Sequence, residues 1–430
     1  MENEFKDTEI GKIPVDWEVS ELKVVTENIF SGGTPDTRKP EYWNGDIPWL
    51  SSGETRNTYI ENTEKKITQK GVENSSTRMA KKEDIVIASA GQGYTRGQAA
   101  FCKIDTYVNQ SIVVIRAKKE ILNPLFLYYN IKLRYNELRA ISDSHSSRGS
   151  LTTKLLAPLK IPLPPIEEQQ KIAEILSALD DKIENNNLQN KILEETANSI
   201  FKEWFVNFNF LDENGKPYLE NGGEMEFNEE LGVGIPKGWS FDELTEFGKI
   251  VCGKTPSKSV DEYFCGETPF IKIPDMHNKM FLVKTEDSLT EKGVQSQKNK
   301  VIPANSVCVS CIATVGLVSM TVKESQTNQQ INSIIPKNDN LTMYLYFTLK
   351  SMTEYIKILA SGGSATLNLN TTEFSKIKII MPEKDILEKY YKEIMPLKNK
   401  ILKNETENIL LSNLRDLLLP KLMGGQIRLK

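Results

Sequence analysis

Four short polar segments carry side chains with the chemistry of base and phosphate contacts: residues 91–96, 144–150, 314–319 and 361–366. Amide and guanidinium groups can form paired hydrogen bonds with adenine and guanine edges, and small hydroxyl residues let a backbone approach phosphates closely. Each segment could equally be a solvated turn. The candidate nucleic-acid contacts are Gln92, Tyr94, Thr95, Arg96, Ser146, Arg148, Lys154, Thr314, Ser361, Ser364, Thr366 and Asn368.

A second motif that could take part in chemistry lies at residues 248–255, which match the G-x-x-x-x-G-K-T phosphate loop at every position. Such a loop needs backbone N–H groups at a helix N-terminus. Ile250 and Val251 are β-branched and resist the unusual dihedrals of that loop, and Pro256 does not begin a plausible long helix. We therefore predict that the match is fortuitous.

Metal and cofactor chemistry has weak support. Cys308 and Cys311 have metal-ligand spacing, but the only histidines are His145 and His277, so we expect the cysteines to be strand residues. The sequence lacks the Gly-rich loop and the Asn/Asp-Pro-Pro-aromatic motif of an adenine methyltransferase, and it has no convincing nuclease centre. We predict a chain without catalytic residues, metal or cofactor.

The elements that position these segments occur twice in the chain. Ile13-Pro14 with Trp17 returns as Ile235-Pro236 with Trp239. The runs 32–35, 42–50, 71–72 and 109–112 return in the same order, at offsets that drift only from 222 to 219. Each copy has strand-like runs, at 84–90 and 306–312, and then a helical stretch, at 125–138 and 343–359. The sequence therefore predicts a tandem duplication.

A long amphipathic helix follows each copy. Apolar residues from Ile172 to Trp204 step by four and three, as in the a/d seam of a coiled coil, and the steps repeat from Tyr390 to Leu422 with Arg415 as the poor fit. Two helices from tandem repeats can meet antiparallel about a pseudo-twofold axis. The alternative is two unrelated surface helices.

Asparagines in both seams define one register for the pair. Placing Asn186 opposite Asn408 and Asn190 opposite Asn404 makes apolar residues meet along the rest of the seam. A buried Asn at such a position fixes register at some loss of stability.

Bulk composition favours a globular protein of two or three domains. The 430 residues include 39% hydrophobic and 26% charged residues, with no apolar run long enough for a membrane span and an acidic, polar N-terminus. Five scattered cysteines fit a reduced cytoplasm. The net charge of −4 arises between the copies, because residues 1–165 (23 basic, 21 acidic) and 236–382 (16 basic, 14 acidic) each carry +2. That balance permits DNA binding.

The repeated motifs resemble those of specificity subunits of type I restriction-modification systems. The residues that carry the resemblance are Ser31-Gly32-Gly33-Thr34-Pro35, the run 42–49, the run 161–169 and the closing run 414–423; in the second copy, 377–382 is a weaker form of the proline motif. The resemblance implies two target-recognition domains that each read half of a split double-stranded DNA site. It also implies that the helices act as spacer and docking surface for methyltransferase subunits, two in number, and for restriction subunits that hold the catalytic activities.

We accordingly expect an α/β protein in which two tandem recognition domains are separated by an antiparallel coiled coil. The expected segments are a first domain at 1–165, a spacer helix at 166–211, a linker at 212–235, a second domain at 236–382, and a second helix with its tail at 383–430. The main alternative is a scaffold whose duplicated domains bind protein partners. A basic face shared by both domains would favour DNA, and neutral or acidic faces would favour the scaffold.

Overall fold

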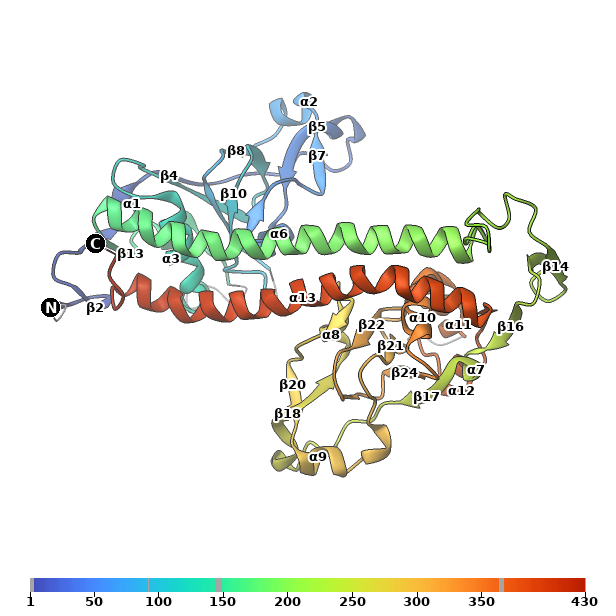
Figure 1. Cartoon of the computed structure of the whole chain (residues 1–430). Helices are drawn as coiled ribbons and strands as arrows, with labels where there is room; N and C mark the ends of the chain where they lie inside the picture. Colours follow the sequence, from blue (N-terminus) through green and yellow to red (C-terminus); the bar gives the residue numbers. More distant parts are fainter. Residues whose placement is uncertain (1–3, 92, 144–148, 363–366, 430) are drawn as a thin grey trace. The chain divides into compact units, whose positions relative to one another are not determined.

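The computed structural model describes residues 4–91, 93–143, 149–362 and 367–429. The chain forms two compact units, the first of residues 1–184 with 410–430 and the second of residues 185–409 (Figure 1). Each unit contains one sequence repeat together with a segment of each long helix. Among the described residues, no helix is long and apolar enough to cross a membrane.

The first unit is built on a five-stranded sheet in the order β4-β12-β9-β10-β6. Its central strands, β9 (Ile85–Ala88) and β12 (Ile112–Ala117), are runs of β-branched residues buried on both faces. A four-stranded sheet lies beside it in the order β7-β5-β11-β8. The other strands are β4 (Thr26–Ser31), β10 (Ala99–Cys102), β6 (Tyr59–Ile60), β7 (Lys65–Ile67), β5 (Trp43–Leu50), β11 (Thr106–Val108) and β8 (Arg78–Ala80).

Two helices cover the five-stranded sheet where the sequence predicts one at 125–138. Asn123 caps α3 (Pro124–Leu133), whose chain then breaks at Arg134 before α4 (Tyr135–Asp143). The remaining elements are the hairpin of β1 (Phe5–Thr8) and β2 (Gly11–Pro14), the pair of β3 (Glu18–Glu21) and β13 (Lys160–Leu163), the short helices α1 (Leu22–Val25), α2 (Gln69–Glu73) and α5 (Thr153–Leu156), and the 3-10 turns Pro40–Tyr42 and Ser52–Arg56.

The second unit repeats this plan, with a five-stranded sheet in the order β17-β24-β21-β22-β19 and a three-stranded sheet in the order β20-β18-β23. The sequence duplication is therefore a duplication of structure. The strands are β16 (Ser240–Glu243), β17 (Gly248–Cys252), β18 (Phe264–Ile271), β19 (Phe281–Leu282), β20 (Asp287–Leu289), β21 (Val307–Ser310), β22 (Val318–Thr321), β23 (Gln326–Thr327), β24 (Ile331–Pro336) and β25 (Lys378–Met381). The helices are α7 (Leu244–Phe247), α8 (Ile273–Met276), α9 (Glu291–Gln295), α10 (Asn340–Ser351), α11 (Thr353–Ala360) and α12 (Thr371–Ser375), with 3-10 turns at Asp261–Tyr263 and Lys298–Lys300.

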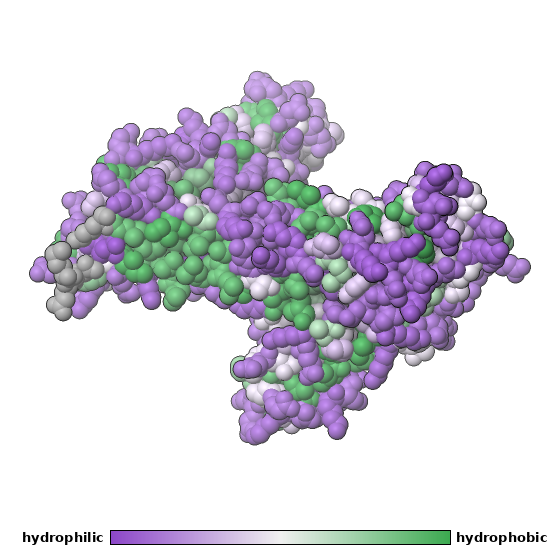
Figure 2. All heavy atoms as spheres, in the orientation of Figure 1, coloured by the Kyte–Doolittle hydropathy of each residue, from purple (hydrophilic) through white to green (hydrophobic). Residues whose placement is uncertain are grey.

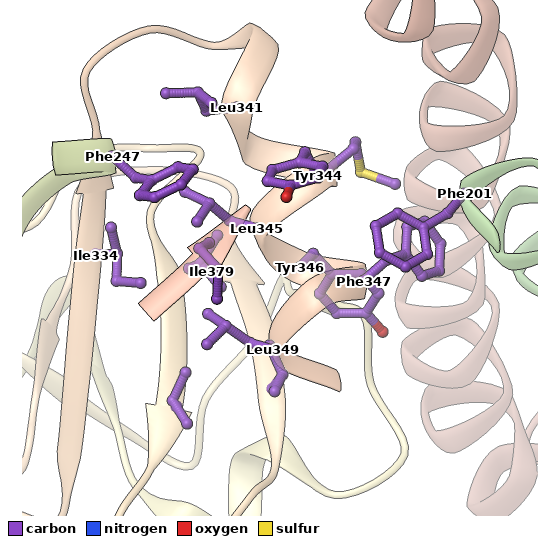
Figure 3. Close-up of a cluster of buried hydrophobic side chains, with 14 of the residues drawn as sticks. Phe201, Phe247, Ile334, Leu341, Tyr344, Leu345, Tyr346, Phe347, Leu349 and Ile379 are labelled. Atoms are coloured by element: carbon purple, nitrogen blue, oxygen red, sulfur yellow. The ribbon is translucent and has the colours of Figure 1, made fainter. Parts of the chain in front are cut away.

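The core of the second unit joins its sheet to the long helix. Side chains of α10 point both toward Ile334 of β24 and toward Phe201, where the rings of Phe201 and Phe347 stack with centroids 5.7 Å apart (Figure 3). Burial of these large aromatic rings fixes the sheet and the helix as one body.

The two long helices are α6 (Ile166–Phe205) and α13 (Lys384–Met423), each of 40 residues. The first ends six residues before the expected position 211, because Phe208 takes a left-handed conformation (φ 55°) that an α-helix does not allow. Within each unit their segments run antiparallel. In the first unit, Ile172 and Leu176 share a buried cluster with Leu419 and Leu422.

The expected linker at 212–235 contains regular structure. A hairpin of β14 (Met225–Asn228) and β15 (Val233–Pro236) lies there, and it is the counterpart of the β1–β2 hairpin that opens the first copy. The structural repeat thus begins before Ile235, where the sequence motif first becomes visible.

Candidate nucleic-acid interface

In the first unit, two of the polar segments meet at one end of the five-stranded sheet. The loop after β9 closes when the Gly97 N–H donates to Ala88 O (2.9 Å), and the second segment joins it where the Leu151 N–H donates to Ser89 O (2.8 Å). At this site Tyr94 and Lys154 are exposed and Thr95 is partly exposed. Gln92, Ser146 and Arg148 lie outside the described residues.

The helix α4 braces this loop. The Tyr135 hydroxyl donates to Tyr94 O (2.8 Å), and the Arg139 guanidinium donates to Gly93 O. Both bonds reach backbone carbonyls, so they hold the loop whatever side chains it carries.

The sequence predicts that Arg96 contacts nucleic acid, which requires its guanidinium to face solvent, but the structure shows it buried. It is 7% exposed and forms an ion pair with Asp143 at the end of α4. Gly149 passes so close that a Cβ at this position would collide with the Arg96 guanidinium. In this structure Arg96 therefore ties the two loops to α4. An ion pair between residues 47 apart leaves no pattern that the sequence could reveal.

In the second unit, the equivalent segments meet in the same way. The Gly316 N–H donates to Ser310 O (2.9 Å) and the Leu369 N–H donates to Cys311 O (2.9 Å), which are the counterparts of the two bonds above. Thr314, Ser361 and Asn368 are all exposed here. Ser364 and Thr366 lie outside the described residues.

The phosphate-loop match lies on a strand. Residues Gly248–Cys252 form β17, which pairs with β24 along its whole length. The Lys254 N–H donates to Thr327 O (2.9 Å), and the next regular element is the 3-10 turn Asp261–Tyr263 rather than a long helix. The N–H groups of Gly253 and Lys254, which such a loop would turn toward a phosphate, donate instead to Ile331 O and Thr327 O.

The two cysteines with metal-ligand spacing, Cys308 and Cys311, are structural. Cys308 lies in β21 and Cys311 directly after it, and both are buried. Burial raises the pKa of the Cys311 thiol to about 11, so the nucleophilic thiolate is disfavoured near neutral pH. Within the described ranges, no group of three or more His, Cys, Asp or Glu residues is arranged to hold a metal ion.

The asparagines of the long helices pair as the seam predicts. Asn186 Nδ2 donates to Asn408 Oδ1 (2.9 Å), and Asn404 Nδ2 donates to Asn190 Oδ1 (2.9 Å). Asn186 and Asn404 are completely buried.

A buried charge cluster that the sequence did not reveal connects the two long helices to α3 in the first unit. Asp180 of α6 accepts hydrogen bonds from Arg415 Nη1 (2.6 Å) and from the Tyr129 hydroxyl (2.9 Å), and it forms an ion pair with Lys132. Although burial opposes it, the hydrogen bond and charge of Asp180 raise the pKa of Arg415. The signal that could have found this cluster was the misfit of Arg415 in an apolar seam.

Comparison with known proteins extends the likeness over the whole chain. A protein-family model described as the type I restriction modification DNA specificity domain matches residues 14–195 and again residues 236–411. The specificity subunit of type I restriction enzyme HindI from Haemophilus influenzae is 39% identical over 412 residues, covering 83% of this chain and 89% of that protein. The specificity subunit of type I restriction enzyme MjaIX from Methanocaldococcus jannaschii is 32% identical over 442 residues, covering 100% and 98%.

The crystal structure of a type I restriction-modification S subunit from M. genitalium shares the fold. It matches with a TM-score of 0.58 and 17% identity, covering 98% of this chain and 99% of that one. Because the family model matches both copies and two relatives exceed 30% identity over most of the chain, this protein belongs to the type I restriction-modification DNA specificity family.

Proposed function

We propose that this chain reads DNA sequence for a type I restriction-modification system, with one half of a split site contacted by each domain. The observation that carries this proposal is the repeated loop pair. Both units hold two loops together through the same two backbone hydrogen bonds, yet the loops differ in sequence. A constant frame with variable side chains is the arrangement expected of two readers of different sequences.

The domain division proposed from the sequence assigns base reading to residues 1–165 and 236–382, joined through 212–235. Residues 166–211 and 383–430 then supply the spacer. Each proposed domain carries a net charge of +2, which favours contact with phosphates. The site contacts we propose are the candidate residues named above, with Arg96 acting as a positioning residue.

Catalysis is proposed to reside in partners, namely two methyltransferase subunits and the restriction subunits. One surface suited to a protein partner lies on α13, where Leu410, Leu414 and Leu417 are 64%, 44% and 57% exposed at spacings of four and three. Figure 2 shows hydrophobic side chains gathered over the long helices in the part that belongs to the first unit. An exposed apolar stripe of this kind marks a protein contact more often than a free surface.

The experiment is to express the chain with its methyltransferase partner and map the methylated DNA. A chimera in which residues 20–160 come from a relative should change one half of the methylated sequence and leave the other half unchanged. Replacing residues 240–380 is the matched control and should change the opposite half. If methylation requires no sequence, or if both halves change in each chimera, the proposal is wrong.

A scaffold that binds only proteins is the second candidate, and it makes a different prediction. Under that hypothesis the chain assembles with its partner, but neither chimera alters the methylated sequence.

A further inference from the structure

The loops that follow β9 and β21 start and end at equivalent places but differ in length. Eight residues, 89–96, separate Ala88 from its hydrogen-bond partner Gly97, whereas five residues, 311–315, separate Ser310 from Gly316. The first loop therefore holds three additional residues within a frame that is otherwise repeated. Tyr94 lies in the longer loop.

The ring of Tyr94 is presented to solvent by a loop that is held in place. It is 81% exposed, and none of the large hydrophobic side chains that the structure describes is more exposed. Behind it, the bonds from Tyr135 and Arg139 fix the carbonyls of Tyr94 and Gly93. Gly93 has φ 70°, a left-handed conformation that lets the chain turn sharply just before the ring.

The equivalent loop of the second unit is also held by a neighbouring helix, but it carries no aromatic residue. Thr353 of α11, which aligns with Tyr135 at the offset of 218, donates its hydroxyl to Gly316 O (3.1 Å). The shorter loop carries Ala313, Thr314 and Val315 in front of it. The longer loop thus adds an aromatic side chain to an arrangement that the second unit forms without one.

The surroundings of Tyr94 favour a nucleic acid over an apolar protein surface as the occupant. Arg139 braces the loop, and the exposed Lys154 lies three residues after Leu151, which bonds to the base of the same loop. An exposed cation in the segment joined to this loop can contact a phosphate, while an exposed ring can contact the face of a base. In a duplex the ring reaches a base face by inserting between two base pairs, as the apolar wedges of other DNA-binding proteins do.

We propose that Tyr94 stacks on a base of the half-site contacted by the first domain, and that the second domain reads its half-site without a stacking residue. This inference rests on the proposed DNA-reading function and assigns Tyr94 a role within it.

The test uses the full-length chain assembled with its methyltransferase partner and a duplex that carries the mapped site. 2-Aminopurine is placed in turn at each position of each half-site, because its fluorescence rises when it loses its normal stacking neighbours. The methyltransferase partner extrudes its target base in each half-site, so those positions should respond in every variant that assembles and serve as internal controls. At the other positions, we expect one in the first half-site, and none in the second, to respond to the wild-type complex. Tyr94→Ala should abolish that response and weaken binding by about tenfold to a hundredfold, the range of one base–aromatic stack.

Two matched variants make the result specific. Tyr94→Phe keeps the ring and should retain both the response and the affinity. Phe227→Ala removes a ring of the second unit that is 71% exposed and is not among the proposed contacts, and it should leave the response unchanged. The dependence of affinity on salt should have the same slope for Tyr94→Ala and wild type, since no charge is removed.

The outcomes separate this inference from the proposed function. If the wild-type complex binds its site and Tyr94→Ala binds equally well with the same fluorescence pattern, the stacking role is wrong while DNA reading stands. If Tyr94→Ala instead loses the methyltransferase subunit, the ring contacts protein and the inference is also wrong. A wild-type complex that binds all duplexes alike would overturn the proposed function itself.

Discussion

Asp180 is the residue whose loss should weaken the first unit most selectively. Its side chain is 2% exposed and compensates the charges of Arg415 and Lys132 while accepting from Tyr129. Asp180→Asn keeps the shape but removes the negative charge, so two cations then share a buried site. Breaking a buried ion pair by changing one partner costs about 3–5 kcal/mol. We expect about 3 kcal/mol here, since Arg415 also contacts the exposed Asp416.

The second unit offers a matched control. Glu194 of α6 accepts from the Tyr346 hydroxyl (2.6 Å) and pairs with Lys350, but its side chain is 28% exposed. Because water screens such a pair, Glu194→Gln should cost about 1 kcal/mol or less. The two variants therefore change similar chemistry at different burial.

Native-state hydrogen exchange measured by mass spectrometry resolves the two units. Asp180→Asn should accelerate exchange in β9 and β12 and leave β21 and β24 near wild type. Adding Arg415→Met to Asp180→Asn should recover part of the loss, because one of the two uncompensated cations is then gone and only Lys132 remains. A loss below about 1 kcal/mol for Asp180→Asn, or an equal loss for Glu194→Gln, would refute the reasoning from burial.

Three further predictions follow from the described contacts. Lys254→Ala should leave DNA binding and assembly unchanged, since the Lys254 N–H donates to Thr327 O and no long helix follows it as in a phosphate loop; loss of nucleotide binding in this variant, measured by calorimetry, would contradict that view. Asn186→Leu combined with Asn408→Leu should raise the denaturation midpoint in urea, because the buried Asn186 Oδ1 accepts no hydrogen bond within the described part of the chain; a lower midpoint would contradict it. Burial raises the pKa of Glu405 to about 8. Between the ordinary pKa of Glu and about pH 8 the folded chain therefore binds more protons than the unfolded chain, so the free energy of unfolding falls as pH rises through that window. Glu405→Gln should remove this fall, and its Tm should be higher than that of the wild type at about pH 9 but not at about pH 5.

The repeat and the long helices could be predicted because both leave recognisable residue patterns in the sequence. Glycines and prolines recur in order, and the seam repeats every three or four residues, so one chain suffices to see them. The break between α3 and α4 escaped prediction since Arg134 is a good helix former. The contact that distinguishes this residue in the fold is tertiary, because Arg134 Nη1 donates to Lys160 O (2.6 Å).

The sequence predicted which loops form the candidate site, but it did not predict which of their side chains are buried and which face solvent. Segment chemistry pointed to the loops at 91–96 and 314–319, and the structure brings each beside its partner segment. It could not distinguish Arg96, which the fold uses to hold the loops together, from Tyr94, which the fold leaves outside. That distinction depends on Asp143, a residue on a different element, and therefore on the folded chain.

The duplication explains how such a site can vary without losing its frame. The bonds that close the loops, Gly97 to Ala88 and Gly316 to Ser310, join backbone atoms and so do not depend on the side chains between them. Three residues can be gained in one copy while the sheet order of both copies stays the same. Substitutions at Tyr94, Thr95 or Thr314 therefore change which groups face a ligand without disturbing a buried contact. Substitutions at Arg96 or Asp180 do the opposite, because each of these side chains is itself buried and forms an ion pair with a different element.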